Sequence, residues 1–205
     1  LLAGGGTHKY KFHLPLYRQH QAIKNAGLLL DRGNLTRVLQ RTAELLEPIY
    51  EMLVASVLSS SVLTVDETPT PAGRKNGKMD KGYFWAFYGE QDEIFYLFSP
   101  SRATVVLDDT LANFQGQLVC DGYSAYQNFV RMTSGVGLVQ CWSHTRREFL
   151  KAEKQDPERS KWALRQIRLM YDVEEEARGE PPNKVLKLRQ KRTKPLVEEL
   201  FNFLK

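Results

Sequence analysis

The 205-residue sequence has few cysteines, no long apolar run and no leader-like start, and each of these absences argues against a class of protein. Its two cysteines, Cys120 and Cys141, lie in apolar stretches, a usage that fits a reducing cytoplasm better than a disulfide framework. No apolar run approaches the roughly 20 residues that a membrane-spanning helix requires. The first residues, LLAGGGTHKY, contain neither an initiator Met nor the charged segment of a signal peptide. We therefore expect a cytoplasmic globular protein without a membrane partner, and a fragment of a longer chain.

Acidic residues are missing from one stretch and concentrated in another. Residues 183–194 contain six bases and no acid, whereas residues 63–121 contain nine acids against five bases. The net charge of +5 by itself indicates an anionic partner only weakly. An acidic centre between basic flanks favours a metal-dependent enzyme that acts on a polyanion, and the alternative is a set of solvated helix faces. Hydrophobic residues make up 42% of the chain, which is typical of a chain with a packed core.

The segment before residue 60 has helical patterns. It predicts a short helix over residues 14–27, a DRGN turn, and a second helix that Asn34 caps and Pro48 kinks. A short helix, a turn and a second helix can form a helix-turn-helix reader of DNA, with Arg37 and Arg41 near the start of the second helix. The alternative is an ordinary helical hairpin, because the turn is longer than is usual in such readers.

The rest of the sequence alternates strand-like and helical patterns. The aromatic and β-branched runs SVLTVDE, GYFWAFYG and EIFYLFSP predict three antiparallel strands with short connections. They are followed by a helix in ATVVLDDTLANF, a fourth strand in GQLVCDGYSAY, a fifth strand in VGLVQCWSH, and helices beginning near His144, at 159–178 and near Lys184. This order predicts an α/β fold with a mixed five-stranded sheet flanked by helices. It is also the order of the ribonuclease-H-like fold, in which the first and fourth strands lie side by side.

Two adjacent acids, Asp66 and Glu67, stand where the first strand is predicted to end at Thr68 and Pro69. If the first and fourth strands are neighbours, their ends bring Asp66 close to Asp121. Two carboxylates a few ångströms apart repel each other unless a cation lies between them, and Mg²⁺ prefers carboxylate oxygens as ligands. We therefore predict that Asp66 and Asp121 are catalytic metal ligands for Mg²⁺ or Mn²⁺. Glu67 falls on the other face of the strand by alternation, so we expect it to be a structural or supporting acid.

The segment CWSHTRREF is the second dense group of polar residues. His144, Arg146 and Arg147 fall at a predicted strand-to-helix junction, where a helix N-terminus, an imidazole and guanidinium groups all favour an anion such as a DNA phosphate. The alternative is a structural histidine with exposed arginines. Cys141 and His144 have zinc-like spacing, but no second pair of ligands follows, which argues against a zinc site. We also count Arg102, in FSPSRA, among the predicted DNA contacts.

Five segments together carry a family resemblance. LTVDETP, KGYFWAFYG, FSPSRA, CDGYSAY and CWSHTRREF resemble, in that order, transposases of the insertion-sequence-sixty-six family, and the resemblance covers residues 8–178. It implies a ribonuclease-H-like core with a DDE triad of carboxylates that binds two Mg²⁺ ions. Such enzymes hydrolyse the phosphodiester at transposon ends and then join the 3′-hydroxyl to target DNA.

The resemblance assigns two of the three acids. Asp66 and Asp121 match the first two members of the triad, and the third is a Glu in a motif with paired asparagines that this sequence does not contain. We expect that acid to lie beyond Lys205 in the parent protein. Within this chain, Glu148 and the run 174–176 are the alternatives.

The predicted organisation has three parts: a helical segment over 1–60 with a possible DNA-binding role, a catalytic core over 61–178, and a linker with a further helix over 179–205. The predicted function is metal-dependent DNA cleavage and strand transfer, by a chain that is an incomplete part of the enzyme. The alternatives are a non-catalytic DNA-binding remnant or another ribonuclease-H-like nuclease. Expected partners are transposon ends, target DNA and further copies of the protein, in the bacterial cytoplasm at the nucleoid.

Overall fold

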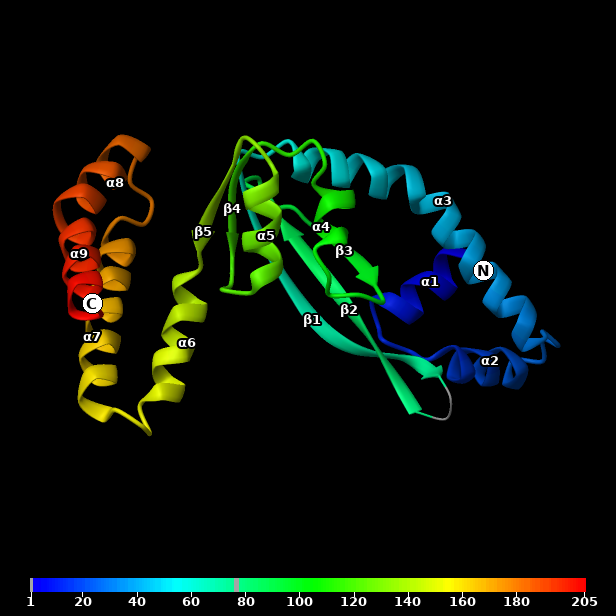
Figure 1. Cartoon of the computed structure of the whole chain (residues 1–205). Coiled ribbons are helices and arrows are strands. Elements are labelled where there is room, and N and C mark those ends of the chain that lie inside the picture. The colour runs from blue at the N-terminus through cyan, green and yellow to red at the C-terminus, as the bar shows by residue number, and fades with distance from the viewer. Residues whose placement is uncertain (1, 76–77) are drawn as a thin grey trace.

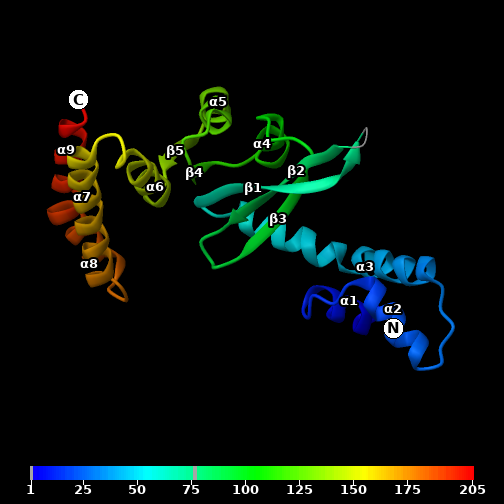
Figure 2. The same ribbon diagram turned by 90° about the horizontal axis from the view of Figure 1, so that it is seen from below.

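The computed structural model describes residues 2–75 and 78–205 and is shown in Figure 1. Three helices lie at the N-terminal end, a sheet with two helices lies in the middle, and a set of helices lies at the C-terminal end. Figure 2 gives the same arrangement from a second direction, with the N-terminal and C-terminal helices on opposite sides of the sheet. The Gly/Lys/Asn-rich connection predicted between the first two strands includes residues 76–77, which lie outside the described residues.

One five-stranded mixed sheet has the order β3-β2-β1-β4-β5. Its strands are β1 (Val62–Lys75), β2 (Lys78–Tyr88), β3 (Ile94–Ser99), β4 (Gly116–Cys120) and β5 (Val136–Gln140). The first three strands pair antiparallel, whereas β4 is parallel to β1 and β5 is parallel to β4. The predicted α/β class, the antiparallel meander and the neighbouring first and fourth strands are confirmed.

The predicted end of the first strand at Thr68 and Pro69 is wrong. β1 continues to Lys75 and stays paired with β2, with Pro69 opposite Tyr83. The physical reason is that β4 pairs with β1 only as far as Thr64, so the rest of β1 has a single neighbouring strand. A proline is tolerated in such an edge position because its missing N–H does not remove a sheet hydrogen bond.

The helices are α1 (Leu2–Tyr10), α2 (Leu16–Asn25), α3 (Arg32–Leu58), α4 (Val105–Thr110), α5 (Ser124–Met132), α6 (Trp142–Ala152), α7 (Pro157–Glu176), α8 (Pro182–Leu188), the π-helical turn η1 (Arg189–Thr193) and α9 (Lys194–Phe203). The prediction that Asn34 caps this helix is wrong. Asp31 is the cap, because its carboxylate accepts the N–H of Gly33 at 2.7 Å, and the predicted DRGN turn is therefore the cap and first turn of α3. Pro48 lies inside this 27-residue helix.

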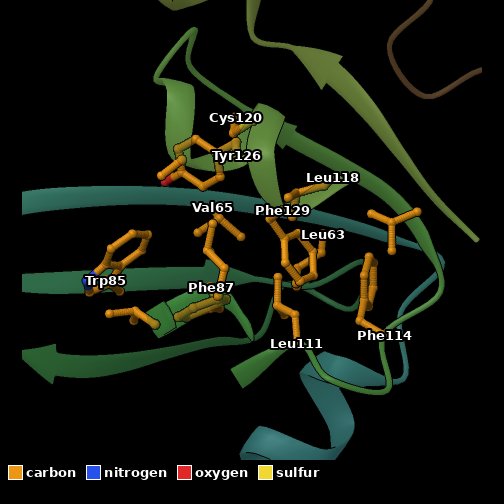
Figure 3. Packing of buried hydrophobic residues seen from close by; sticks show 14 of the residues in the cluster. Leu63, Val65, Trp85, Phe87, Leu111, Phe114, Leu118, Cys120, Tyr126 and Phe129 are labelled. Atoms are coloured by element: carbon orange, nitrogen blue, oxygen red, sulfur yellow. The ribbon is translucent and has the colours of Figure 1, made fainter. Parts of the chain in front are cut away.

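The main core covers one face of the sheet (Figure 3). Leu63 and Val65 from β1 and Trp85 and Phe87 from β2 point toward this face and are almost completely buried. They pack with β4 and with helices α4 and α5, and Val57 brings the C-terminal end of α3 to the same core. Residues of the opposite parity therefore belong to the other face of the sheet, where the side chains of β2 and β3 are more open. The large exposed aromatic residues there are Phe84, Tyr88, Tyr96 and Phe98.

A second, smaller hydrophobic cluster joins α7 to α9. It consists of Ala163, Ile167, Met170 and Leu200, with partly buried Trp142, Phe149, Trp162, Leu196 and Val197 around it. The helix α7, which the sequence analysis placed in the catalytic core, therefore packs with the C-terminal helices as well as with α6. Among the helices of the described residues, none is long and apolar enough to cross a membrane.

Candidate functional site

The register of β1 and β4 brings Asp66 and Asp121 to the same level of the sheet. The two parallel strands pair Leu63 with Leu118 and, last, Thr64 with Val119. Asp66 lies two residues beyond this last pair in β1, and Asp121 directly follows the end of β4 at Cys120. Neighbouring strands lie about 4.8 Å apart. Because Leu63 faces the core, alternation along β1 places Asp66 on the open face, whereas Asp121 follows the last residue of β4 and its Oδ2 atom lies 3.9 Å from Nη2 of Arg102. Their side chains are 51% and 23% exposed, so both are accessible to a substrate.

His144 approaches Asp66 from α6. Its Nε2 atom lies 3.6 Å from Oδ2 of Asp66. The N–H of Cys141, the residue before α6, donates to the carbonyl of Cys120 at 2.8 Å, and this bond holds the start of α6 beside the end of β4. Nδ1 of His144 is buried and has no hydrogen-bond partner among the described residues. The predicted junction therefore places His144 beside Asp66, with the N-terminus of α6 next to it.

Glu67 has a different environment from its neighbour Asp66. Its side chain is completely buried, and its Oε1 atom accepts the Nε–H of Arg102 at 2.5 Å. Its other oxygen, Oε2, accepts the hydroxyl of Tyr126. The separation that strand alternation predicts is present: Glu67 belongs to the core face, and Asp66 to the open face. A buried carboxylate is tolerated here because a cation and a hydroxyl both bind it.

Arg102 lies between Glu67 and the candidate site. Its Nη2 atom also comes within 3.9 Å of Oδ2 of Asp121. The centre of its guanidinium lies 3.8 Å from the centre of the Tyr123 ring, and the Tyr123 hydroxyl donates to the carbonyl oxygen of Arg102 at 3.2 Å. The side chain is 39% exposed. Arg102 remains a predicted DNA contact, but its guanidinium is already bound by a buried carboxylate, a partner that no local sequence pattern indicates.

The buried groups around this network have shifted pKa values. Burial opposes the charge on Arg102, but the hydrogen bond and negative charge of Glu67 outweigh it and raise the pKa of Arg102. Burial, with the hydrogen bond to Glu67, raises the pKa of Tyr126, so its hydroxyl stays a donor. Burial, with the nearby charges of Asp121 and Glu67, raises the pKa of the Cys120 thiol to about 12. Cys120 is therefore a neutral core residue at pH 7 and not a nucleophile.

The donor atoms fit a hard divalent cation whose coordination is completed by water and phosphate. Mg²⁺ is commonly bound through one or two carboxylates, with waters and substrate oxygens in the remaining positions. Asp66 and Asp121 supply two such carboxylates on an open surface. Over residues 2–75 and 78–205 there is no group of three or more His, Cys, Asp or Glu side chains arranged to hold a metal ion. Within this part of the chain the protein thus offers two acids and not three.

The in-chain alternatives for the third acid are engaged elsewhere. Glu148 pairs with Lys151 at 2.7 Å on α6. Glu174 binds Arg189 through two hydrogen bonds, of 2.9 and 2.6 Å, and Glu176 binds Arg192. These last pairs fasten α7 to η1, at the end of the molecule that Figure 1 shows beyond α6. They also neutralise part of the basic stretch 183–194, whose charge the sequence analysis assigned to a polyanionic partner.

The predicted DNA contacts fall in two places. Arg146 and Arg147 are exposed on α6, one turn beyond His144 or less, and neither forms an ion pair among the described residues. Arg37 and Arg41 are exposed in the first half of α3, whereas only the C-terminal end of that helix reaches the sheet. Arg41 pairs with Glu44 at 2.8 Å. The structure therefore places His144 beside Asp66, leaves Arg146 and Arg147 as exposed residues of the same helix, and leaves Arg37 and Arg41 apart from the two acids on α3.

Comparison with known proteins identifies the family of the chain. A family model described as "Transposase IS66 family" matches residues 1–205. Two similar proteins come from Sinorhizobium fredii (strain NBRC 101917 / NGR234). "Uncharacterized protein y4jD" is 33% identical over 213 residues, and "Uncharacterized protein y4qI" is 28% identical over 220 residues.

The matches cover 94% and 98% of this chain but 40% of each relative. The chain therefore spans less than half the length of the curated relatives that it matches. Since the family match extends over all of its residues, the chain belongs to the IS66 family of transposases.

Proposed function

We propose that this chain is part of the catalytic core of a DDE transposase with a ribonuclease-H-like fold. The protein would cleave DNA at transposon ends and join the freed 3′-hydroxyl to target DNA. The observation that carries the proposal is the parallel pairing of β1 and β4, since Asp66 lies two residues beyond the paired Thr64 and Asp121 lies two residues beyond its partner Val119. The strand order and the mixture of antiparallel and parallel pairs support the ribonuclease-H-like assignment.

In this proposal each group has a role that its position allows. Asp66 and Asp121 hold Mg²⁺ or Mn²⁺, which supplies charge stabilisation at the attacking and leaving oxygens of the phosphodiester. The N-terminus of α6, with His144, Arg146 and Arg147, binds the DNA phosphates beside the two acids and orients the strand for attack. Arg37 and Arg41 contact DNA further away, along α3.

The third acid of the triad is proposed to come from a part of the whole protein outside this chain. The described residues contain no group of three ligands, and the relatives are longer than the chain. The segments 1–60, 61–178 and 179–205 are then the helical DNA-binding segment, the core, and the start of a further helical region. Action at paired ends as a homo-oligomer, in the bacterial cytoplasm at the nucleoid, belongs to the same proposal.

Strand transfer by the whole protein tests the assignment. With Mg²⁺ and transposon-end DNA, we expect Asp66→Asn and Asp121→Asn each to lower the rate about a hundredfold or more, since each removes a ligand of the cation that stabilises the transition state. Asp108→Asn is the matched control, because Asp108 is an exposed acid in the first turn of α4. Full activity of both site variants would refute the metal assignment.

A DNA-binding protein without catalysis is the second candidate, and the lack of a third ligand in the described residues favours it. In that case the wild-type whole protein would bind transposon-end DNA but neither cleave nor join it with Mg²⁺ or Mn²⁺.

A further inference from the structure

Arg102 lies between two carboxylates but binds them very unequally. Its guanidinium donates to the buried Glu67 through Nε at 2.5 Å and also contacts it through Nη2. The same Nη2 atom is 3.9 Å from Asp121, beyond the distance of a hydrogen bond. Without a competing partner, an arginine next to an aspartate is expected to form the short paired bonds that guanidinium and carboxylate groups prefer. Some other contact must therefore hold Arg102 away from Asp121.

Glu67 supplies that cause. Its side chain is completely buried, so it cannot satisfy its charge with water and holds the guanidinium instead. Tyr126 fixes the second carboxylate oxygen from the core side, so Glu67 cannot turn toward another partner. The ring of Tyr123 covers one face of the guanidinium at 3.8 Å, which further limits its movement.

We propose that Glu67 is a positioning residue for the candidate metal site: it holds Arg102 away from Asp121 and thereby leaves the Asp121 carboxylate available to a divalent cation. This inference rests on the proposed function, in which Asp121 is a metal ligand. Glu67 touches neither metal nor DNA in this arrangement. It acts through Arg102, whose charge would otherwise occupy the carboxylate that the metal needs.

The size of the effect follows from the distance that Arg102 would travel. If Arg102 closed from 3.9 Å to a normal hydrogen-bond length on Asp121, the added attraction at an effective dielectric constant of about 20 corresponds to roughly a tenfold change in an equilibrium constant. A cation that competes for Asp121 has to overcome this attraction. Loss of the Glu67 charge is therefore expected to weaken divalent-metal binding about tenfold, with the fold retained.

The test is Mn²⁺ binding to the purified whole protein, measured by electron paramagnetic resonance of the free ion during titration. Glu67→Gln keeps the shape of the side chain and can still bind Arg102 and Tyr126, but it removes the charge that restrains Arg102. We expect about tenfold weaker Mn²⁺ binding in this variant. The double variant Glu67→Gln with Arg102→Gln also removes the competing cation, and we expect its Mn²⁺ affinity to return to the wild-type value or above.

The double variant separates positioning from a merely structural role. If Glu67 only supports the fold, removing Arg102 as well adds damage and binding does not recover, which would overturn the inference. Unchanged binding in Glu67→Gln would overturn it too. Circular dichroism of each variant at the titration temperature checks that the chain is folded.

Asp121→Asn distinguishes the two levels of the proposal. If wild-type Mn²⁺ binding is lost in Asp121→Asn but unaffected in Glu67→Gln, the inference fails and the proposed metal site stands. If Asp121→Asn binds Mn²⁺ like the wild type, the metal assignment fails, and the inference fails with it.

Discussion

Replacing Tyr126 by Phe is a direct test of the buried network. The Tyr126 side chain is fully buried, and its hydroxyl donates to Oε2 of Glu67. Its ring makes edge contacts with Trp85 and Tyr123, with ring centres 6.1 and 6.4 Å away. Phe keeps the ring and these contacts, so Tyr126→Phe removes the hydroxyl and leaves one oxygen of a buried carboxylate without its donor.

The expected cost follows from the charge on the acceptor. A hydrogen bond to a charged group contributes about 1.5–3 kcal/mol to stability, and a buried acceptor left without a partner loses that amount. For a chain of this length, each kcal/mol corresponds to about 2–4 °C in melting temperature, so the melting temperature of Tyr126→Phe should fall by roughly 3–12 °C. Urea unfolding followed by circular dichroism gives the free energy, and a thermal scan gives the melting temperature.

Tyr123→Phe is the matched control. The Tyr123 hydroxyl donates at 3.2 Å to a neutral carbonyl, that of Arg102, and the residue is only partly buried. A neutral hydrogen bond of this kind contributes about 0.5–1.5 kcal/mol. If Tyr126→Phe cost no more than Tyr123→Phe, the buried charge on Glu67 would not be what the Tyr126 hydroxyl stabilises, and the reasoning would be refuted.

Three other expectations concern separate features of the chain. Replacing Arg146 and Arg147 by Ala should weaken DNA binding and lower the slope of log affinity against log salt by about two, since each phosphate contact contributes about one. Fluorescence anisotropy at several salt concentrations measures the slope, and an unchanged slope would contradict the proposal that these two arginines contact phosphates. Folding raises the pKa of the Cys120 thiol from 9.0 to about 12, so the unfolded chain loses this proton first as the pH rises. The free energy of unfolding should therefore fall above about pH 9, by up to about 1.4 kcal/mol per pH unit. Urea unfolding at several pH values should show this slope in the wild type but not in Cys120→Ala, and equal slopes would count against the buried thiol. Gly116→Ala should destabilise the fold by more than the roughly 1–3 kcal/mol of backbone strain alone, because φ is +148° and a Cβ would lie 2.3 Å from the carbonyl oxygen of Ser61. Gly27→Ala is the control for strain without a clash, because φ is +87° and the space around it is open. Equal losses of unfolding free energy in the two variants would remove the steric argument.

The sheet could be predicted from sequence because its signals are local. Alternating β-branched and aromatic residues identify each strand, and the order of strands and helices limits how the sheet is connected. The extension of β1 beyond Pro69 could not be predicted, since it depends on pairing with Tyr83 and its neighbours in β2 and on the early end of the β4 pairing. A proline ends a strand or lies at its edge, and the sequence does not say which.

The N-terminal helix α1 was missed for a similar reason. Its sequence LAGGGTHKY has three consecutive glycines, and glycine is a poor helix former. In the folded chain Gly5 and Gly6 are buried against α3: a Cβ on Gly6 would lie 3.3 Å from the side chain of Thr42, and one on Gly5 would lie 3.8 Å from that of Leu39. Small residues therefore allow the close approach of two helices, and packing outweighs the intrinsic propensity.

The candidate site was predictable to the extent that the order of the strands determines it. Asp66 follows an apolar run inside β1, Asp121 follows one at the end of β4, and the parallel pairing of these two strands was predictable from the order of the elements. Arg102 was assigned by sequence to DNA, because its partner Glu67 is 35 residues away and no local pattern connects the two. A buried acid requires a donor or a cation, so the signal for such a partner is that Glu67 shares one face of the strand with the apolar residues Leu63 and Val65.

A buried ion pair is weak evidence for stability, because desolvation of the two charges offsets most of their attraction. This makes stability a poor reason for Glu67 and Arg102 to be charged, whereas the two binding functions give a better one. In the proposed function, the partly exposed guanidinium of Arg102 attracts DNA phosphate, but it also competes for Asp121 unless another acid restrains it. The double variant Glu67→Gln with Arg102→Gln should therefore separate the two functions: Mn²⁺ affinity is recovered, while affinity for transposon-end DNA in metal-free buffer falls, by about threefold to tenfold for one lost phosphate contact at low salt. Anisotropy titrations of wild type, Glu67→Gln and the double variant measure the second effect, and DNA affinity that is equal in all three would show that Arg102 does not face the phosphate.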